Sequence, residues 1–143
     1  MEERELNILS ENASWSYNYA FVSREGVATK NIGTMSFKIH PGHIIQKWWF
    51  IDDYGDEVSF LNDIKQIDEH NYEYESNELA GVVPMKGTMY AERNRLYRQF
   101  SMGDTPLNGF EIIIRKGDKC EIYGIIYFEN KMIKSWNGVL EKM

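Results

Sequence analysis

The sequence predicts an all-β protein, an antiparallel up-and-down barrel of about eight to ten short strands. Aromatic residues make up 14% of the 143 residues, and Trp, Tyr and Phe favour pleated strands over helices. Short runs of alternating apolar and polar residues recur along the chain, with turn signals between them. No helical stretch separates these runs, so the pattern disfavours a parallel sheet with crossover helices.

The predicted strands follow one another with little chain between them. They cover residues 13–22, 34–40, 44–52, 57–67, 71–76, 82–91, 95–102, 109–115, 120–128 and 132–140. Turn-forming sequences separate several of them, namely Asp53-Tyr54-Gly55-Asp56, Arg93-Asn94, Lys116-Gly117-Asp118-Lys119 and Glu129-Asn130-Lys131. Only the N-terminal piece, residues 3–11, is predicted as a short helix, with a disordered arm over 1–11 as the alternative.

The first predicted strand has one aromatic face. Trp15, Tyr17, Tyr19 and Phe21 are two residues apart, and residues two apart share a face of a strand. Buried Tyr and Trp need polar partners for their OH and NH groups, which the mouth of a barrel can supply. The pattern therefore resembles a closed calycin-like or lipocalin-like barrel with a lumen.

Length and charge limit the classes of function. A chain of 143 residues fits one domain, residues 1–143. The net charge of -6 disfavours nucleic-acid binding, and the basic cluster Lys86, Arg93, Arg95 and Arg98 is interpreted as a solvated strand face. Cys120 is the single cysteine, so no intrachain disulfide forms and a reducing compartment is expected. Neither a signal peptide nor a membrane span is visible, so we expect a cytoplasmic protein without a membrane partner.

Three parts of the sequence carry candidate site residues. Tyr17 and Tyr19 would place two hydroxyls on one face about 7 Å apart, at ~3.4 Å per residue. Lys47 lies within an apolar strand, where it either pairs with an anion or extends to the barrel end. Glu78 follows the predicted strand 71–76 and is either a loop carboxylate or an acid directed into the mouth. From the two tyrosines alone, an ordinary aromatic core is the favoured explanation.

In this order the residues resemble the small cofactor-free phenolic acid decarboxylases. The resemblance comprises Tyr17-x-Tyr19, the run from Ile39 to Trp48, and the run from Tyr72 through Glu78 to Gly81. The family has Arg where this chain has Lys47, and a further family tyrosine falls at Glu25. Lys lacks the bidentate geometry of guanidinium, and a carboxylate cannot donate to an anionic substrate.

The resemblance implies a lyase without metal or organic cofactor that acts on a small aromatic or unsaturated acid in the lumen. It implies catalytic roles for Tyr17, Tyr19, Lys47 and Glu78, in which the tyrosines hold the carboxylate. The ligand-binding residues expected around them are Trp15, Phe21, Ile39, Trp49 and Tyr72. Members of the family are often dimers, so a homodimer is one expected assembly. No metal site is expected, since His40, His43 and His70 lack zinc-site spacing.

Two alternatives stay open at this point. A barrel of the same kind could bind a small apolar or aromatic ligand without chemistry. It could also be another barrel enzyme, an isomerase or cyclase, that uses the same tyrosines. The departures at Lys47 and Glu25 favour these alternatives.

Overall fold

A computed structural model describes residues 6–76 and 84–143 of the chain. These residues form ten strands. In chain order they are β1 (Ala13–Ser23), β2 (Ala28–His40), β3 (His43–Ile51), β4 (Glu57–Gln66), β5 (Asn71–Ser76), β6 (Met85–Glu92), β7 (Arg95–Met102), β8 (Leu107–Lys116), β9 (Lys119–Phe128) and β10 (Lys131–Lys142).

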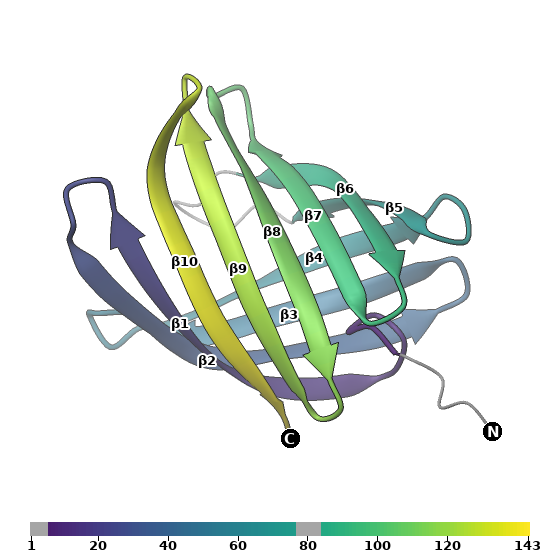
Figure 1. Ribbon diagram of the computed structural model, residues 1–143. Helices are drawn as coiled ribbons and strands as arrows, with labels where there is room; N and C mark the ends of the chain where they lie inside the picture. The colour runs from purple at the N-terminus through teal and green to yellow at the C-terminus, as the bar shows by residue number, and fades with distance from the viewer. Residues whose placement is uncertain (1–5, 77–83) are drawn as a thin grey trace.

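The strands close into one antiparallel barrel, which confirms the predicted fold class (Figure 1). Each strand pairs with the next one in the chain, and β1 closes the ring by pairing with β10. The closing register places Tyr17 opposite Leu140 and Tyr19 opposite Gly138. Closure removes the exposed sheet edges that would otherwise pair with other chains.

Local turn chemistry explains why the hairpins are tight. Pro41 and Gly42 connect β2 to β3, where His40 and His43 face each other. Gly42 has φ +81°, a conformation that glycine adopts without strain. Arg93, in the predicted Arg93-Asn94 turn, has φ 54° and connects β6 to β7.

Two predicted elements differ from the structure. Strand β2 begins at Ala28 rather than at residue 34, because residues 28–32 pair with β1 although they are mostly polar. The predicted N-terminal helix is wrong for residues 6–11, where the chain makes a turn, while residues 1–5 lie outside the described part. The apolar Ile8 and Leu9 are buried in the core instead of lying on one face of a helix.

The inward faces of the strands make the core. On β1 the buried positions alternate, and exposure rises from 0% at Trp15 through 2% at Tyr17 to 4% at Tyr19, with Phe21 half-buried. At the Trp15 end, Ile8 and Leu9 pack into this core. The described residues contain no helix long and apolar enough to cross a membrane.

Candidate functional site

The interior at the Phe21 end of β1 contains a cavity of about 310 Å³. Most of its wall is aromatic or otherwise apolar, because nearly every strand turns an apolar inward residue to this end of the barrel. The lining residues are Tyr17, Tyr19, Phe21, Asn31, Trp48, Phe50, Phe60, Met85, Arg98, Phe100, Met102, Glu111, Ile126, Lys134 and Trp136.

Trp48 of β3 holds the aromatic wall together. Its ring centroid lies 5.2 Å from that of Tyr17 and 5.8 Å from that of Tyr19, both in edge-on geometry. It also stacks on Phe60 of β4 at 5.6 Å. Such ring pairs add stability beyond the apolar area they bury, so this wall is well ordered by its own contacts.

A buried ion pair lies among these rings. Arg98 of β7 and Glu111 of β8 are 7% and 2% exposed, and Arg98 Nη2 lies 3.1 Å from Glu111 Oε1. Trp136 Nε1 donates to the other carboxylate oxygen, Glu111 Oε2, at 2.8 Å. The Arg98 guanidinium lies over Phe100, 5.1 Å from its ring centroid. Burial is the largest single influence and lowers the pKa of Arg98, but Glu111, Tyr74 and Tyr19 together outweigh it and raise the pKa, so the guanidinium stays charged.

Three side chains of the cavity wall carry a buried donor atom for which residues 6–76 and 84–143 offer no hydrogen-bond partner. These atoms are the Tyr19 hydroxyl, Trp48 Nε1 and Arg98 Nε. A buried donor without an acceptor costs about 1–3 kcal/mol. The surface that the wall turns to the cavity is therefore almost entirely apolar, which favours an apolar ligand.

The two tyrosines of the sequence motif both line the cavity. Their ring centroids are 4.9 Å apart, but their hydroxyls differ in their contacts. The Tyr17 hydroxyl donates to Asn31 Oδ1 at 2.6 Å, whereas the Tyr19 hydroxyl has no partner. Burial raises the pKa of both phenols above the usual value, so each is a neutral hydrogen-bond donor near pH 7.

The structure does not bring Lys47 into this cavity. Burial alternates along β3, with Gln46 and Trp48 buried and Lys47 exposed between them, so Lys47 points outward. A one-residue step along a strand reverses the face. Glu78 lies outside the described residues. The buried cation beside the tyrosines is therefore Arg98, which the sequence pattern had assigned to a solvated face.

The five predicted ligand-binding residues are distributed over several environments. Phe21 lines the cavity, and Trp15 lies beyond it, fully buried at the closed end. Tyr72 is half-buried and packs against the core without lining the cavity. Ile39 is 41% exposed near the β2–β3 turn, and Trp49 points outward beside Lys47. The expectation that Ile39 and Trp49 contact a luminal ligand is therefore wrong. Ile39 follows Met35 and Phe37 on the inward face but lies exposed at the turn, away from the cavity, whereas Trp49 is on the outward face.

Of the cavity residues, the sequence analysis named only Tyr17, Tyr19 and Phe21 as site residues, and among those it missed are Arg98, Glu111, Lys134 and Trp136. They lie on β7, β8 and β10, outside the segments that resemble the decarboxylase family. The alternation Leu96, Arg98, Phe100 was the available signal, because an arginine between two core residues of the same face must point inward. The matching Glu111 also lies on an inward face, between Gly109 and Ile113.

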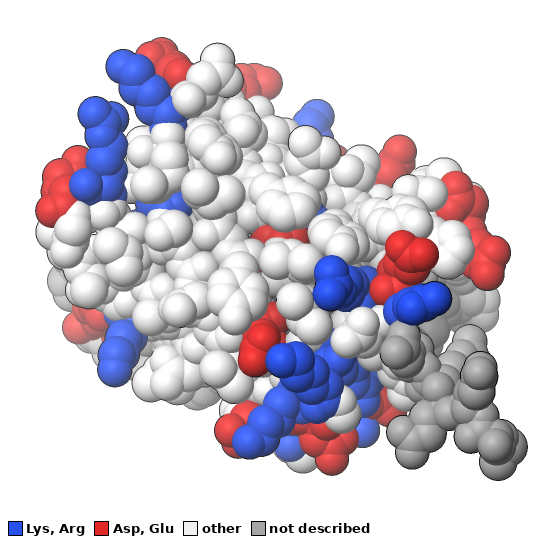
Figure 2. Space-filling view, viewed as in Figure 1, with Lys and Arg blue, Asp and Glu red and all other residues white. Residues whose placement is uncertain are grey.

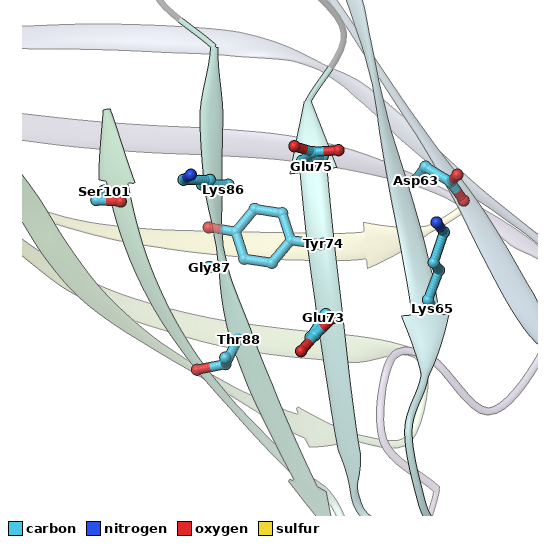
Figure 3. A pocket seen from close by; sticks show the side chains of 9 residues that line it. All are labelled: Asp63, Lys65, Glu73, Tyr74, Glu75, Lys86, Gly87, Thr88 and Ser101. Atoms are coloured by element: carbon cyan, nitrogen blue, oxygen red, sulfur yellow. The ribbon is translucent and has the colours of Figure 1, made fainter. Parts of the chain in front are cut away.

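A second hollow, of about 450 Å³, lies over the outer face of β4 to β7 (Figure 3). Its charged side chains are Asp63, Lys65, Glu73, Glu75 and Lys86. Lys65 is opposite Glu73 and Lys86 is opposite Glu75 in the strand register, an arrangement typical of a solvated face. We therefore take the luminal cavity as the candidate site.

Comparisons with known proteins support the fold. No family model matches the sequence, and no curated protein matches it. Among solved structures, the barrel is similar to the S-type phycobiliprotein lyase CPES from Guillardia theta, with a TM-score of 0.65 and 11% identity over 92% of this chain and 87% of that chain. A de novo designed fluorescence-activating β-barrel gives a TM-score of 0.46 and 13% identity over 93% of this chain and 94% of that chain. At such identity the lyase similarity shows a shared barrel and no more.

Proposed function

We propose that this protein binds a small aromatic molecule in the lumen of the barrel. The observation that carries the proposal is the cavity of about 310 Å³ in the barrel interior, whose wall is mostly aromatic and otherwise apolar. Ligand sites in proteins are lined predominantly by hydrophobic and aromatic side chains in this way. The similar phycobiliprotein lyase agrees with the barrel architecture of such a site.

The size of the cavity limits the ligand. An apolar cavity of roughly 150 Å³ can hold benzene, so about 310 Å³ suits one substituted ring or two fused rings. Burying such a ligand removes on the order of 200 Å² of apolar area from water, which is worth ~5 kcal/mol at ~25 cal/mol per Å². This hydrophobic contribution alone corresponds to a submillimolar dissociation constant.

A decarboxylase of the phenolic acid kind is the second candidate. The specific observation in its favour is that Tyr17 and Tyr19 share the aromatic cavity. Protonation of the side-chain double bond of a para-hydroxycinnamate, together with loss of the phenolic proton, gives a quinone-methide intermediate. Loss of CO2 then returns the electron pair to the phenol oxygen, which takes up a proton, and no metal or organic cofactor is needed. In this chain the nearby cation would be Arg98 in place of Lys47, while Glu78 would remain the acid implied by the family pattern.

One titration separates the two candidates. The purified protein is mixed with p-coumaric and ferulic acids, and the ultraviolet absorbance and the heat of binding are followed together. Saturable heat with an unchanged acid band supports binding without chemistry. Loss of the acid band at a rate proportional to protein concentration supports the decarboxylase. Neither heat nor loss, with either acid or with a neutral aromatic probe such as 4-phenylbutyramide, would contradict the proposed function.

The homodimer stays a proposal about assembly. Figure 2 shows few charged side chains on the face formed by β8, β9 and β10. Phe110, Tyr123 and Val139 are 42%, 49% and 47% exposed on these strands. Because the chain carries a net charge of -6, two copies repel each other least where charges are sparse. Sedimentation velocity at micromolar concentrations tests this, and Tyr123→Lys should shift a dimer to monomer.

A further inference from the structure

A hollow lies beside the lumen, between two hairpins. Strand β2 starts at Ala28, but its pairing with β3 begins only at Gly33, opposite Phe50. Residues 28–32 therefore pair with β1 alone, and the β1–β2 hairpin diverges from the β3–β4 hairpin (Figure 1). We call the hollow between these hairpins the notch; its volume is about 630 Å³.

The notch adjoins the luminal cavity. Phe21, Asn31, Phe50 and Lys134 line both hollows. A ligand longer than one ring can therefore extend from the aromatic wall into the notch. The far part of such a ligand would meet a different, more polar surface.

Two lysines border the notch without an acidic partner. Among residues 6–76 and 84–143, neither Lys30 nor Lys134 makes an ion pair. The Lys134 ammonium lies over Phe21, 5.4 Å from its ring centroid, at the junction of the two hollows. Asp52 and Asp53 lie across the notch on the β3–β4 hairpin. The Asp52 carboxylate accepts hydrogen bonds from the backbone N–H groups of Tyr54 and Asp56, at 2.9 Å each, so the turn already uses it.

Charge favours an anion at the junction. Arg98 and Glu111 neutralise each other inside the lumen, which leaves Lys134 as the uncompensated charge among the described residues of the luminal wall. Asp52 and Asp53 border the notch and do not line the lumen. A carboxylate placed there also keeps part of its hydration, which deep burial beside the tyrosines would remove.

We propose that the ligand is an aromatic monoanion whose ring occupies the lumen and whose anionic group lies at the notch beside Lys134, with Lys30 as a second cation. This inference rests on the proposed luminal binding. It places the acid at the notch, whereas the decarboxylase resemblance places it against Tyr17 and Tyr19.

The test uses three probes with the same ring and chain: 4-phenylbutyrate, its primary amide and 4-phenylbutylammonium. Calorimetry compares the wild-type protein with Lys134→Gln, Lys134→Arg and the matched control Lys38→Gln. The control removes an exposed lysine of β2 that does not border the notch. We expect Lys134→Gln to lower the affinity for the acid about three- to tenfold and to leave the affinity for the amide unchanged. A hydrogen bond to a charged group at a partly solvated site contributes that much. Lys134→Arg and Lys38→Gln should bind the acid as the wild type does, and the ammonium probe should bind most weakly.

The outcomes distinguish the position of the anionic group from luminal binding itself. Three results would show that the anionic group does not lie at the notch, while luminal binding stands. In the first, Lys134→Gln does not change the affinity for the acid. In the second, it lowers the affinities for the acid and the amide equally, and in the third the ammonium probe binds most tightly. If Tyr19→Phe weakens the acid far more than Lys134→Gln does, the acid lies at the tyrosines and the proposed orientation is reversed. If none of the three probes binds the wild-type protein, luminal binding itself fails.

Discussion

The two ends of the barrel differ in how their interiors are filled. At one end the N-terminal segment closes the barrel, with Ile8 and Leu9 only 1% and 3% exposed. Arg115 donates to the backbone oxygen of Asn7 at 3.3 Å and pairs with Glu11, which also accepts from Lys142 at 2.9 Å. At the other end the inward residues surround a cavity that adjoins the notch.

This difference shows how one strand pattern supports both stability and binding. Along β1, Trp15 is packed under Arg115, whose guanidinium lies 5.1 Å from its ring, while Phe21 borders the hollow. The closed end can supply the packing that orders the barrel. The hollow end can then leave its aromatic surface uncovered, at a cost in stability, for a ligand to bury.

The largest effect is expected from Glu111→Leu at the hollow end. This change leaves the Arg98 guanidinium buried without its counter-charge, which typically costs 3–5 kcal/mol. Urea unfolding followed by circular dichroism measures the free energy of unfolding. The double variant Arg98→Met with Glu111→Leu should regain most of the loss, because two apolar side chains need no compensation. A loss below about 1 kcal/mol for the single variant would mean that water reaches Arg98 and that the lumen is not dry.

A pair of truncations should sharpen the contrast between the two ends. Leu9→Ala at the closed end removes a fully packed side chain and should lower the free energy of unfolding by about 2–4 kcal/mol. Met85 lines the existing cavity and is half-buried, so we expect Met85→Ala to lower the free energy of unfolding by only about 1 kcal/mol. The same unfolding assay compares them. Equal losses would show that the two ends are packed alike.

A smaller effect concerns pH at the closed end. Hydrogen bonds from Lys142 and Arg115 lower the pKa of Glu11 below the usual value of 4.5. A carboxylate with a lowered pKa stabilises the fold above its unfolded pKa, and that contribution disappears as the pH falls from about 4.5 through the lower folded value.

Glu11→Gln should therefore cost about 1 kcal/mol at pH 7 and progressively less below pH 4.5. Thermal unfolding of both proteins between pH 3 and pH 7 measures this difference. A constant difference in melting temperature across that range would rule out the titration of Glu11 as its cause. Glu141→Gln, an exposed acid on β10, is the matched control.

The sequence predicts the barrel well and the site only in part. Alternation along the strands is a local property, so the inward placement of Tyr17, Tyr19 and Phe21 could be deduced from the sequence. Lys47 was misplaced because a strand with apolar residues on both faces hides its alternation. Arg98 and Glu111 meet only through the β7–β8 register, and the closing role of Ile8 and Leu9 depends on tertiary packing, which no local pattern reports.

The central claim is that the hollow end of the barrel takes up a small aromatic molecule. Calorimetric titration of 4-phenylbutyrate into the wild-type protein, Ile126→Trp and Tyr123→Trp tests it most directly, since Ile126 lines the cavity and Tyr123 lies outside on the same strand. The account predicts saturable one-to-one binding by the wild type and by Tyr123→Trp, and at least tenfold weaker binding by Ile126→Trp, whose indole fills the space. Equal affinity in all three proteins, or no binding by the wild type, would contradict it.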